Sequence, residues 1–217
     1  MTTEQANPAP RPDNQDPSLF GQTPSQTVGP FFHYGLPWKG CADLVGDTDI
    51  GARTELFPED HYVLAKPTAK GEVAGEVITL EGVVLDAAGE VVPDAMIEIW
   101  QADASGRYAD GSSNTGFIGF GRASTGEDGV YRFRTVRPGR VDDQQAPHIA
   151  VGVFGRGLIK RLATRAYFDD EAANADDPIL ALVPIERRDT LIARKVGDVW
   201  RFDITLQGER ETVFFDI

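Results

Sequence analysis

The sequence predicts an all-β domain, an antiparallel β-sandwich with an extended N-terminal arm and little helix. Its 23 glycines and 14 prolines supply many turns, which favour short strands over long helices. After residue 75, β-branched and apolar residues recur in short runs, several of them with the two-residue period of a strand. Turn sequences separate these runs at close intervals, as in sandwiches and barrels. Hydrophobic residues make up 41% of the 217, enough for one sizeable core.

Three segments follow from the changes in composition. Residues 1–22 are rich in Pro, Gln, Asn and Asp, cannot bury enough surface to offset their ordering entropy, and are expected to form a flexible tail. Residues 23–75 contain many aromatic side chains without regular spacing. Such residues are rarely left exposed together, so we expect an arm that contributes to an interface and a pocket. Residues 76–217 are expected to form the β-sandwich core.

The core strands are predicted from alternation and from the turns between them. Residues 77–86 form an apolar, β-branched run that ends at a turn over 87–90. Residues 91–101 then alternate in polarity, as do residues 130–136, which end at the Pro-Gly pair 138–139. Further strands are expected at 149–154, 164–168, 190–195 and 199–207.

Two segments between the strands receive other interpretations. Residues 169–175 are the one plausible helical piece, because acidic residues suit a helix N-terminus. Their carboxylates form either a solvated cap or a metal site, and the usual exposure of acidic groups favours the cap. The glycine-rich run 116–121 (GFIGFG) does not lie between a strand and a helix, so it is interpreted as a loop and not as a phosphate-binding motif.

The charge balance excludes several classes of function. The formal net charge is −13, whereas nucleic-acid binding and anionic membrane surfaces both require a cationic face. Cys41 is the only cysteine, which excludes an internal disulfide and a multi-cysteine metal site and fits a reducing cytosol. The N-terminus lacks the features of a signal peptide, and no apolar run reaches the ~20 residues of a membrane span. We therefore expect a soluble, cytoplasmic protein.

The histidines do not form an obvious metal site. His148 and Ala150 stand two apart at the start of a predicted strand, where two histidines would both reach one ion. The second position is a methyl group here and cannot ligate. His33 and His61 lie in the arm without ligand spacing, and no nucleophilic triad, Walker loop or dinucleotide fingerprint is present.

Several blocks, taken in order, resemble the intradiol catechol dioxygenases. The resemblance covers roughly residues 20–217 and implies a β-sandwich in which two tyrosines and two histidines hold ferric iron. That iron activates a bound catecholate so that O₂ cleaves the ring between its two hydroxyls. The blocks are 95–108 (AMIEIWQADASGRY), 120–122 (FGR), 128–133 (DGVYRF), 137–139 (RPG), 146–149 (APHI), 23–30 (TPSQTVGP), 165–171 (RAYFDDE), 189–195 (DTLIARK) and 201–217.

The resemblance also shows which iron ligands this chain lacks. Tyr108 matches the first tyrosine and His148 the first histidine. Val141, beside Arg140, stands where the second tyrosine is expected, and Ala150 replaces the second histidine. In addition, Gln145 replaces a nearby arginine. One phenol and one imidazole are too few donors for ferric iron, so Tyr108 and His148 are interpreted as vestigial, with no metal and no catalytic residue within this chain.

The resemblance is strongest to the non-iron α chains of members built from α and β subunits. It implies that an iron-bearing β subunit is the partner and that Fe³⁺ is held there. The pocket between the two chains would cleave 3,4-dihydroxybenzoate with O₂ to 3-carboxy-cis,cis-muconate, in the β-ketoadipate pathway of aromatic catabolism. Substrate-binding roles carry over to Thr27, Gly29, Pro30 and Phe31 of the arm and to Arg156, whose guanidinium suits a carboxylate.

Other interpretations stay open at this point. The arm could serve only as an interface, Phe31 could be buried packing, and Arg156 could be a surface residue or the partner of an Asp or Glu. The whole chain could instead be a self-sufficient iron intradiol dioxygenase with an unusual ligand set. It could also be a non-enzymatic β-sandwich binding module, because such folds serve unrelated functions.

Overall fold

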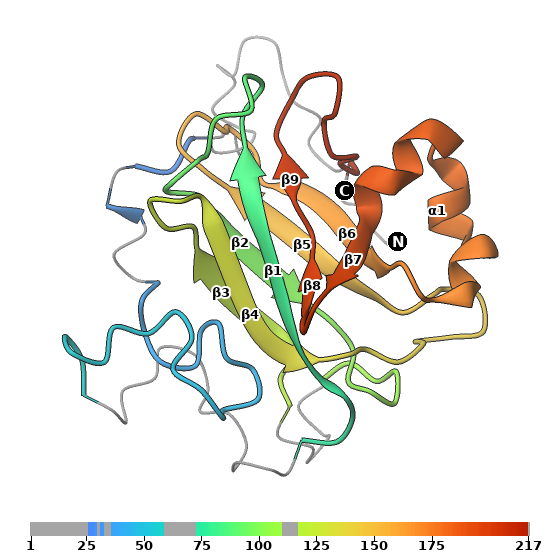
Figure 1. The fold of residues 1–217 in the computed structure, drawn as a ribbon, viewed down its shortest axis with the longest axis horizontal. Coiled ribbons are helices and arrows are strands. Elements are labelled where there is room, and N and C mark those ends of the chain that lie inside the picture. Colours follow the sequence, from blue (N-terminus) through green and yellow to red (C-terminus); the bar gives the residue numbers. More distant parts are fainter. Residues whose placement is uncertain (1–25, 30, 33–35, 59–72, 110–116, 217) are drawn as a thin grey trace, which may run out of the picture.

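The computed structural model describes residues 26–29, 31–32, 36–58, 73–109 and 117–216. Nine strands and three short helices lie within these ranges (Figure 1). They are β1 (Val77–Leu85), β2 (Met96–Trp100), β3 (Phe120–Ser124), β4 (Val130–Val136), β5 (His148–Phe154), β6 (Leu162–Phe168), η2 (Ala172–Ala175), α1 (Pro178–Leu182), η3 (Ile185–Leu191), β7 (Ile192–Val196), β8 (Val199–Arg201) and β9 (Ile204–Thr205).

The strands form two layers with the hydrophobic core between them, as the predicted β-sandwich requires (Figure 1). One layer has the order β3-β2-β5-β6 and the other β7-β8-β1-β4, with β9 also paired to β1. A parallel pairing of β6 with β7 joins the layers. Most pairs are antiparallel as expected, but β1 pairs in parallel with both β8 and β9, so the sheet is mixed.

The predicted alternation places side chains correctly in the central strands. In β4, Tyr131, Phe133 and Thr135 are buried, while Arg132 lies on the outer face. β1 matches its predicted range almost completely. β2 is shorter than the predicted 91–101, because a proline-containing turn occupies the first residues of that run.

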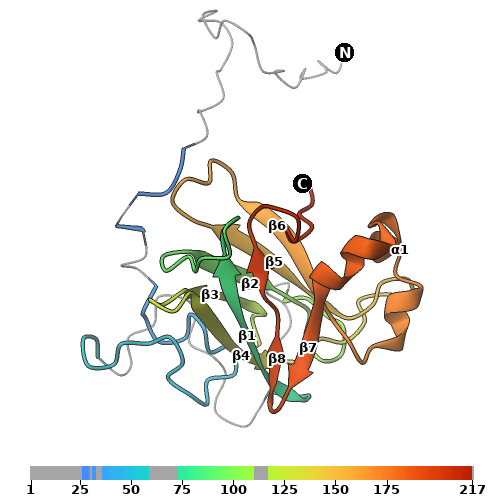
Figure 2. The same ribbon diagram turned by 45° about the horizontal axis from the view of Figure 1, so that its top comes forward.

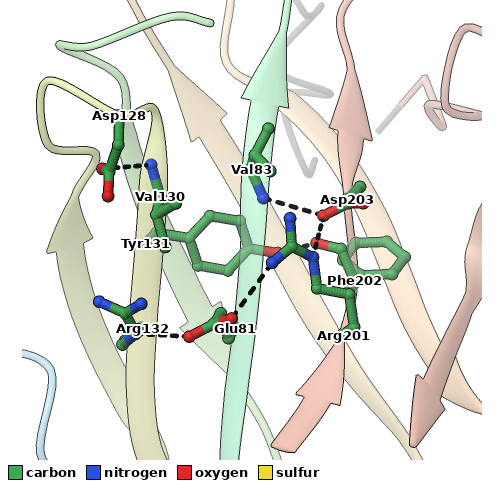
Figure 3. Close-up of polar contacts among 9 residues, drawn as sticks. All are labelled: Glu81, Val83, Asp128, Val130, Tyr131, Arg132, Arg201, Phe202 and Asp203. Carbon is green, nitrogen blue, oxygen red and sulfur yellow. Dashed lines mark hydrogen bonds and ion pairs between the residues drawn. The ribbon is translucent and has the colours of Figure 1, made fainter. Parts of the chain in front are cut away.

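Three further predicted ranges were wrong. The predicted strand 190–195 begins only at Ile192, because η3 extends to Leu191. The run 116–121 is not loop throughout, because β3 begins at Phe120 and pairs with β2. A Cβ at Gly121 would lie 2.6 Å from a methyl carbon of Leu44, so this glycine serves close packing. The predicted strand 199–207 is interrupted at Phe202, whose carbonyl accepts a hydrogen bond from the Tyr131 hydroxyl at 2.5 Å (Figure 3).

The helical region is larger than predicted. Residues 169–175 do contain a helical turn, η2, which begins after the N-cap Glu171. The helices α1 and η3 were not anticipated, although Asp177 caps α1 through its carboxylate and Pro178 occupies the first turn. Figure 2 shows these helices beside the strand layers, with the C-terminal segment next to β6. Residue Phe215 donates its backbone N–H to Ala163 of β6 at 2.8 Å.

Part of the arm is built into the core. In residues 36–58, the Cys41 carbonyl accepts from the backbone of Arg122 in β3 at 2.7 Å. The Ala42 carbonyl accepts from Arg134 in β4 at 2.9 Å, and Leu44 N–H donates back to Arg134 at 2.8 Å. The segment 41–44 therefore joins the outer edges of the two layers. The Cys41 thiol is buried there. The predicted tail, residues 1–22, lies outside the described residues.

Among the described residues, none of the helices has the length and apolar character needed to cross a membrane.

Candidate functional site

The predicted vestigial site lies on the outer face of the layer formed by β2, β5 and β6. Strand register places Trp100, Ala150 and Arg165 side by side, and places His148 opposite Tyr167. Side chains at such paired positions share one face of a sheet. Tyr108 joins them by stacking on the Trp100 ring, with 5.4 Å between ring centroids. The structure thus places Tyr108 on the face of the sheet that also carries His148.

Both of these potential donors are held in neutral form. His148 is only 5% exposed, and burial lowers the pKa of its imidazole below the ordinary value of 6.5. Its Nδ1–H donates to the Ala146 carbonyl at 2.8 Å. Burial also raises the pKa of the Tyr108 phenol above 10.0, so the side chain is a phenol and not a phenolate at neutral pH.

A fixed guanidinium belongs to the same cluster. Arg165 Nη1 donates to Gln145 Oε1 at 2.9 Å and lies 3.5 Å from the Tyr167 hydroxyl. Tyr167 in turn donates to Asp177 Oδ1 at 3.1 Å, and burial raises its pKa to about 12. The positive charge of Arg165 adds to the lowering of the His148 pKa, after burial. Arg165 therefore places a positive charge beside the position where a metal would need donors.

The residues present do not fit ferric iron. That ion requires several anionic oxygen or imidazole donors. Val141 and Ala150 provide hydrocarbon, Tyr108 and His148 are neutral, and Arg165 adds positive charge. Among the described residues, no group of three or more His, Cys, Asp or Glu side chains is placed to hold a metal. We therefore assign no metal chemistry to this face.

The second predicted element, Arg156, lies in the connection between β5 and β6. Its side chain is 58% exposed and forms an ion pair through Nε with the carboxylate of Asp94, which precedes β2. Thr27, far away in sequence, contacts the same loop. Its Oγ1 accepts from Gly157 N–H at 2.8 Å and donates to the Gly155 carbonyl at 3.4 Å. One arm residue, Thr27, therefore bonds the residue before Arg156 and the residue after it.

A pocket of about 600 Å³ lies where the arm meets this loop. Phe32 and Phe154 line it together, with their ring centroids 6.2 Å apart. Gly29 follows Val28, which also lines the pocket, and a Cβ built on Gly29 would meet no atom within 4 Å. Phe31 is 77% exposed, so it is not buried packing within this chain. Pro30 lies outside the described residues.

Two residues of these sites received no role from the sequence. Arg165 was recognised only within the run 165–171, yet its alternation with Tyr167 in a predicted strand could have placed both on one face. Asp94 offered no signal, because its pairing with Arg156 depends on how two distant turns meet.

The sequence of this chain is similar over most of its length to proteins of a known family. A family model described as Dioxygenase matches residues 54–208. The protocatechuate 3,4-dioxygenase alpha chain of Burkholderia cepacia is 46% identical over 208 residues, covering 90% of this chain and 98% of that one. The protocatechuate 3,4-dioxygenase beta chain of the same organism is 35% identical over 191 residues, covering 79% of each chain.

A solved structure agrees with the fold. The dioxygenase domain of a dioxygenase carbohydrate-binding protein fusion from Streptomyces sp. SirexAA-E superposes with a TM-score of 0.54 at 26% sequence identity. The match covers 86% of this chain and 98% of that domain.

Proposed function

This chain belongs to the intradiol dioxygenase family, and on that premise we propose that it is the non-iron α subunit of a protocatechuate 3,4-dioxygenase. Its partner is an iron-bearing β subunit, and together they cleave 3,4-dihydroxybenzoate with O₂ between the two hydroxyls. The cluster around Arg165 is the observation that supports assigning the iron to the β subunit and not to this chain. Where an iron centre needs donors, this chain has two neutral side chains, two hydrocarbon positions and a fixed cation.

In this proposal the chain contributes recognition. The guanidinium of Arg156 pairs with the carboxylate of the substrate, since charge-assisted pairs of this kind are strong and directional. The open space around Gly29 lets the backbone approach a flat aromatic ring. The exposed ring of Phe31 offers an apolar wall to the partner or the substrate.

The partner contributes the metal. Ferric iron bound in the β subunit supplies the activation of the catecholate toward O₂. Our chain closes the pocket over the end of the substrate that carries the carboxylate. The 46% identity to the Burkholderia cepacia alpha chain, over 98% of that chain, supports this assignment. The similarity to the beta chain of Burkholderia cepacia also supports it.

Purification with and without an iron-bearing β chain tests the proposal. We expect the isolated chain to contain no stoichiometric iron, to be colourless and to consume no O₂ with 3,4-dihydroxybenzoate. The co-expressed complex should contain about one iron per αβ pair, absorb visible light through tyrosinate-to-iron charge transfer and turn over. Stoichiometric iron and turnover in the isolated chain would overturn the proposal.

A further inference from the structure

We propose that Asp94 and Thr27 are positioning residues that hold Arg156 in the orientation that receives a substrate carboxylate. The inference rests on the proposed function and goes beyond it by assigning roles to the residues behind the arginine. Asp94 orients the guanidinium itself. Thr27 fixes the short loop that carries it.

The ion pair joins one mostly buried side chain to one exposed side chain. The side chain of Asp94 is 16% exposed, whereas that of Arg156 is 58% exposed. The carboxylate is therefore the anchor, and the long arginine side chain is the part that it restrains. An arginine loses substantial rotamer entropy when a ligand fixes it, so restraint before binding favours affinity.

The atoms that pair decide which edge of the guanidinium stays available. Asp94 Oδ2 contacts Nε of Arg156, on the side of the planar group. The guanidinium has five N–H donors, and the edge made by its two terminal nitrogens can bind a carboxylate through two parallel hydrogen bonds. Pairing at Nε thus orients the group without using that terminal edge.

Thr27 acts on the loop from the arm. Its single hydroxyl proton is directed to the Gly155 carbonyl, and its oxygen accepts from Gly157 N–H. These two backbone groups flank Arg156 in the chain. Gly157 has a positive φ of 88°, so the loop conformation depends on glycine there and gains a partner from Thr27. With its proton used in this way, Thr27 holds the loop and does not donate to the substrate.

The αβ complex tests the inference through a comparison of two substrates. Asp94→Asn and Thr27→Val should each raise the KM for 3,4-dihydroxybenzoate roughly three- to tenfold, the effect of one lost hydrogen bond or ion pair. The KM for catechol, which has no carboxylate, should rise less than the KM for 3,4-dihydroxybenzoate, and the kcat for 3,4-dihydroxybenzoate should fall less than its KM rises. Thr27→Ser keeps the hydroxyl and should restore the KM, which a loss of packing alone would not allow.

A double-mutant cycle shows whether the effect passes through Arg156. In an Arg156→Ala background, Asp94→Asn and Thr27→Val should cause no further rise in KM. An equal rise in that background would overturn the inference, as would a lower KM for Asp94→Asn, which would make Asp94 a competitor of the substrate. Failure of Arg156→Ala to separate the two substrates would instead overturn the carboxylate role in the proposed function.

Discussion

Arg165 on β6 stands directly opposite Ala150 on β5, at the position where a second histidine would complete a His-x-His pair. A hydrogen bond from Nη1 to Gln145 and the contact with the Tyr167 hydroxyl hold the guanidinium in place. The face therefore differs from an iron site in two ways, because donors are absent and a cation is present. Restoring the donors alone does not remove the second difference.

Replacing the missing ligands tests this distinction. We expect the variant Val141→Tyr/Ala150→His to bind no stoichiometric ferric iron while Arg165 remains, because two like charges a few ångströms apart repel each other strongly in a half-buried site. Adding Arg165→Gln should raise the iron content measured by elemental analysis, with a visible absorption band. Full iron occupancy in the double variant would show that the guanidinium is no barrier.

The buried His148 should make stability depend on pH. Its folded pKa is depressed, so between the folded value and the unfolded value of 6.5 the unfolded chain binds more protons. The free energy of unfolding therefore falls as pH drops through this window. Between about pH 7.5 and about pH 5.5 the loss from this residue should reach up to about 1 kcal/mol.

Chemical denaturation at both pH values measures the effect. His148→Gln loses the bond to Ala146 and should be less stable at both, but its stability should change less between them. An identical change in the variant and the parent chain would exclude His148 as the source. The comparison stays above the range in which most carboxylates titrate.

Gly82 should tolerate no side chain. A Cβ there would lie 1.8 Å from the Phe202 carbonyl oxygen and 2.7 Å from the Tyr131 hydroxyl oxygen, the two groups joined by a hydrogen bond across β1 (Figure 3). Gly82→Ala should lower the free energy of unfolding by about 3 kcal/mol, through overpacking and loss of that bond. Gly29→Ala, at an open position, is the matched control and should change it by less than about 0.5 kcal/mol. Denaturant unfolding of the isolated chain compares them.

Arg156→Ala should separate carboxylated from uncarboxylated substrates. Removing a charge-assisted pair costs about 1.5–3 kcal/mol, which corresponds to roughly a 10- to 150-fold rise in the KM for 3,4-dihydroxybenzoate. The KM for catechol should change little. Steady-state oxygen uptake by the αβ complex gives both values, and equal responses would show that Arg156 does not contact the carboxylate.

The sequence predicted the elements that local patterns determine. β4 was predicted to the residue, because strict alternation and flanking turns coincide there. α1 carried a usable signal in Asp177 followed by Pro178, but the nearby acidic run drew the helix prediction to 169–175. The parallel pairings of β1 with β8 and β9 have no local signature, since they depend on which distant strands become neighbours.

The candidate site also has residues that the sequence could locate and contacts that it could not. The family resemblance paired Tyr108 with His148, and the strand pattern located His148 at the start of β5. The stacking of Tyr108 on Trp100 came only from the structure. The bonds from Thr27 to Gly155 and Gly157, and the pairing of Asp94 with Arg156, join segments whose separation in sequence hides their contact. Only the three-dimensional fold brings Asp94 to Arg156 and Thr27 to the two glycines that flank it.

The way in which segment 41–44 links β3 to β4 constrains the order of folding. This piece leaves the ribosome early, yet its backbone partners, Arg122 and Arg134, are synthesised some eighty or more residues later. It can therefore make these native contacts, and bury Leu44 and Val45 as in the folded chain, only once both later strands exist. Closure of the sandwich is in this sense a late event that the first part of the chain completes, and we expect the slow, long-range pairing to limit the folding rate.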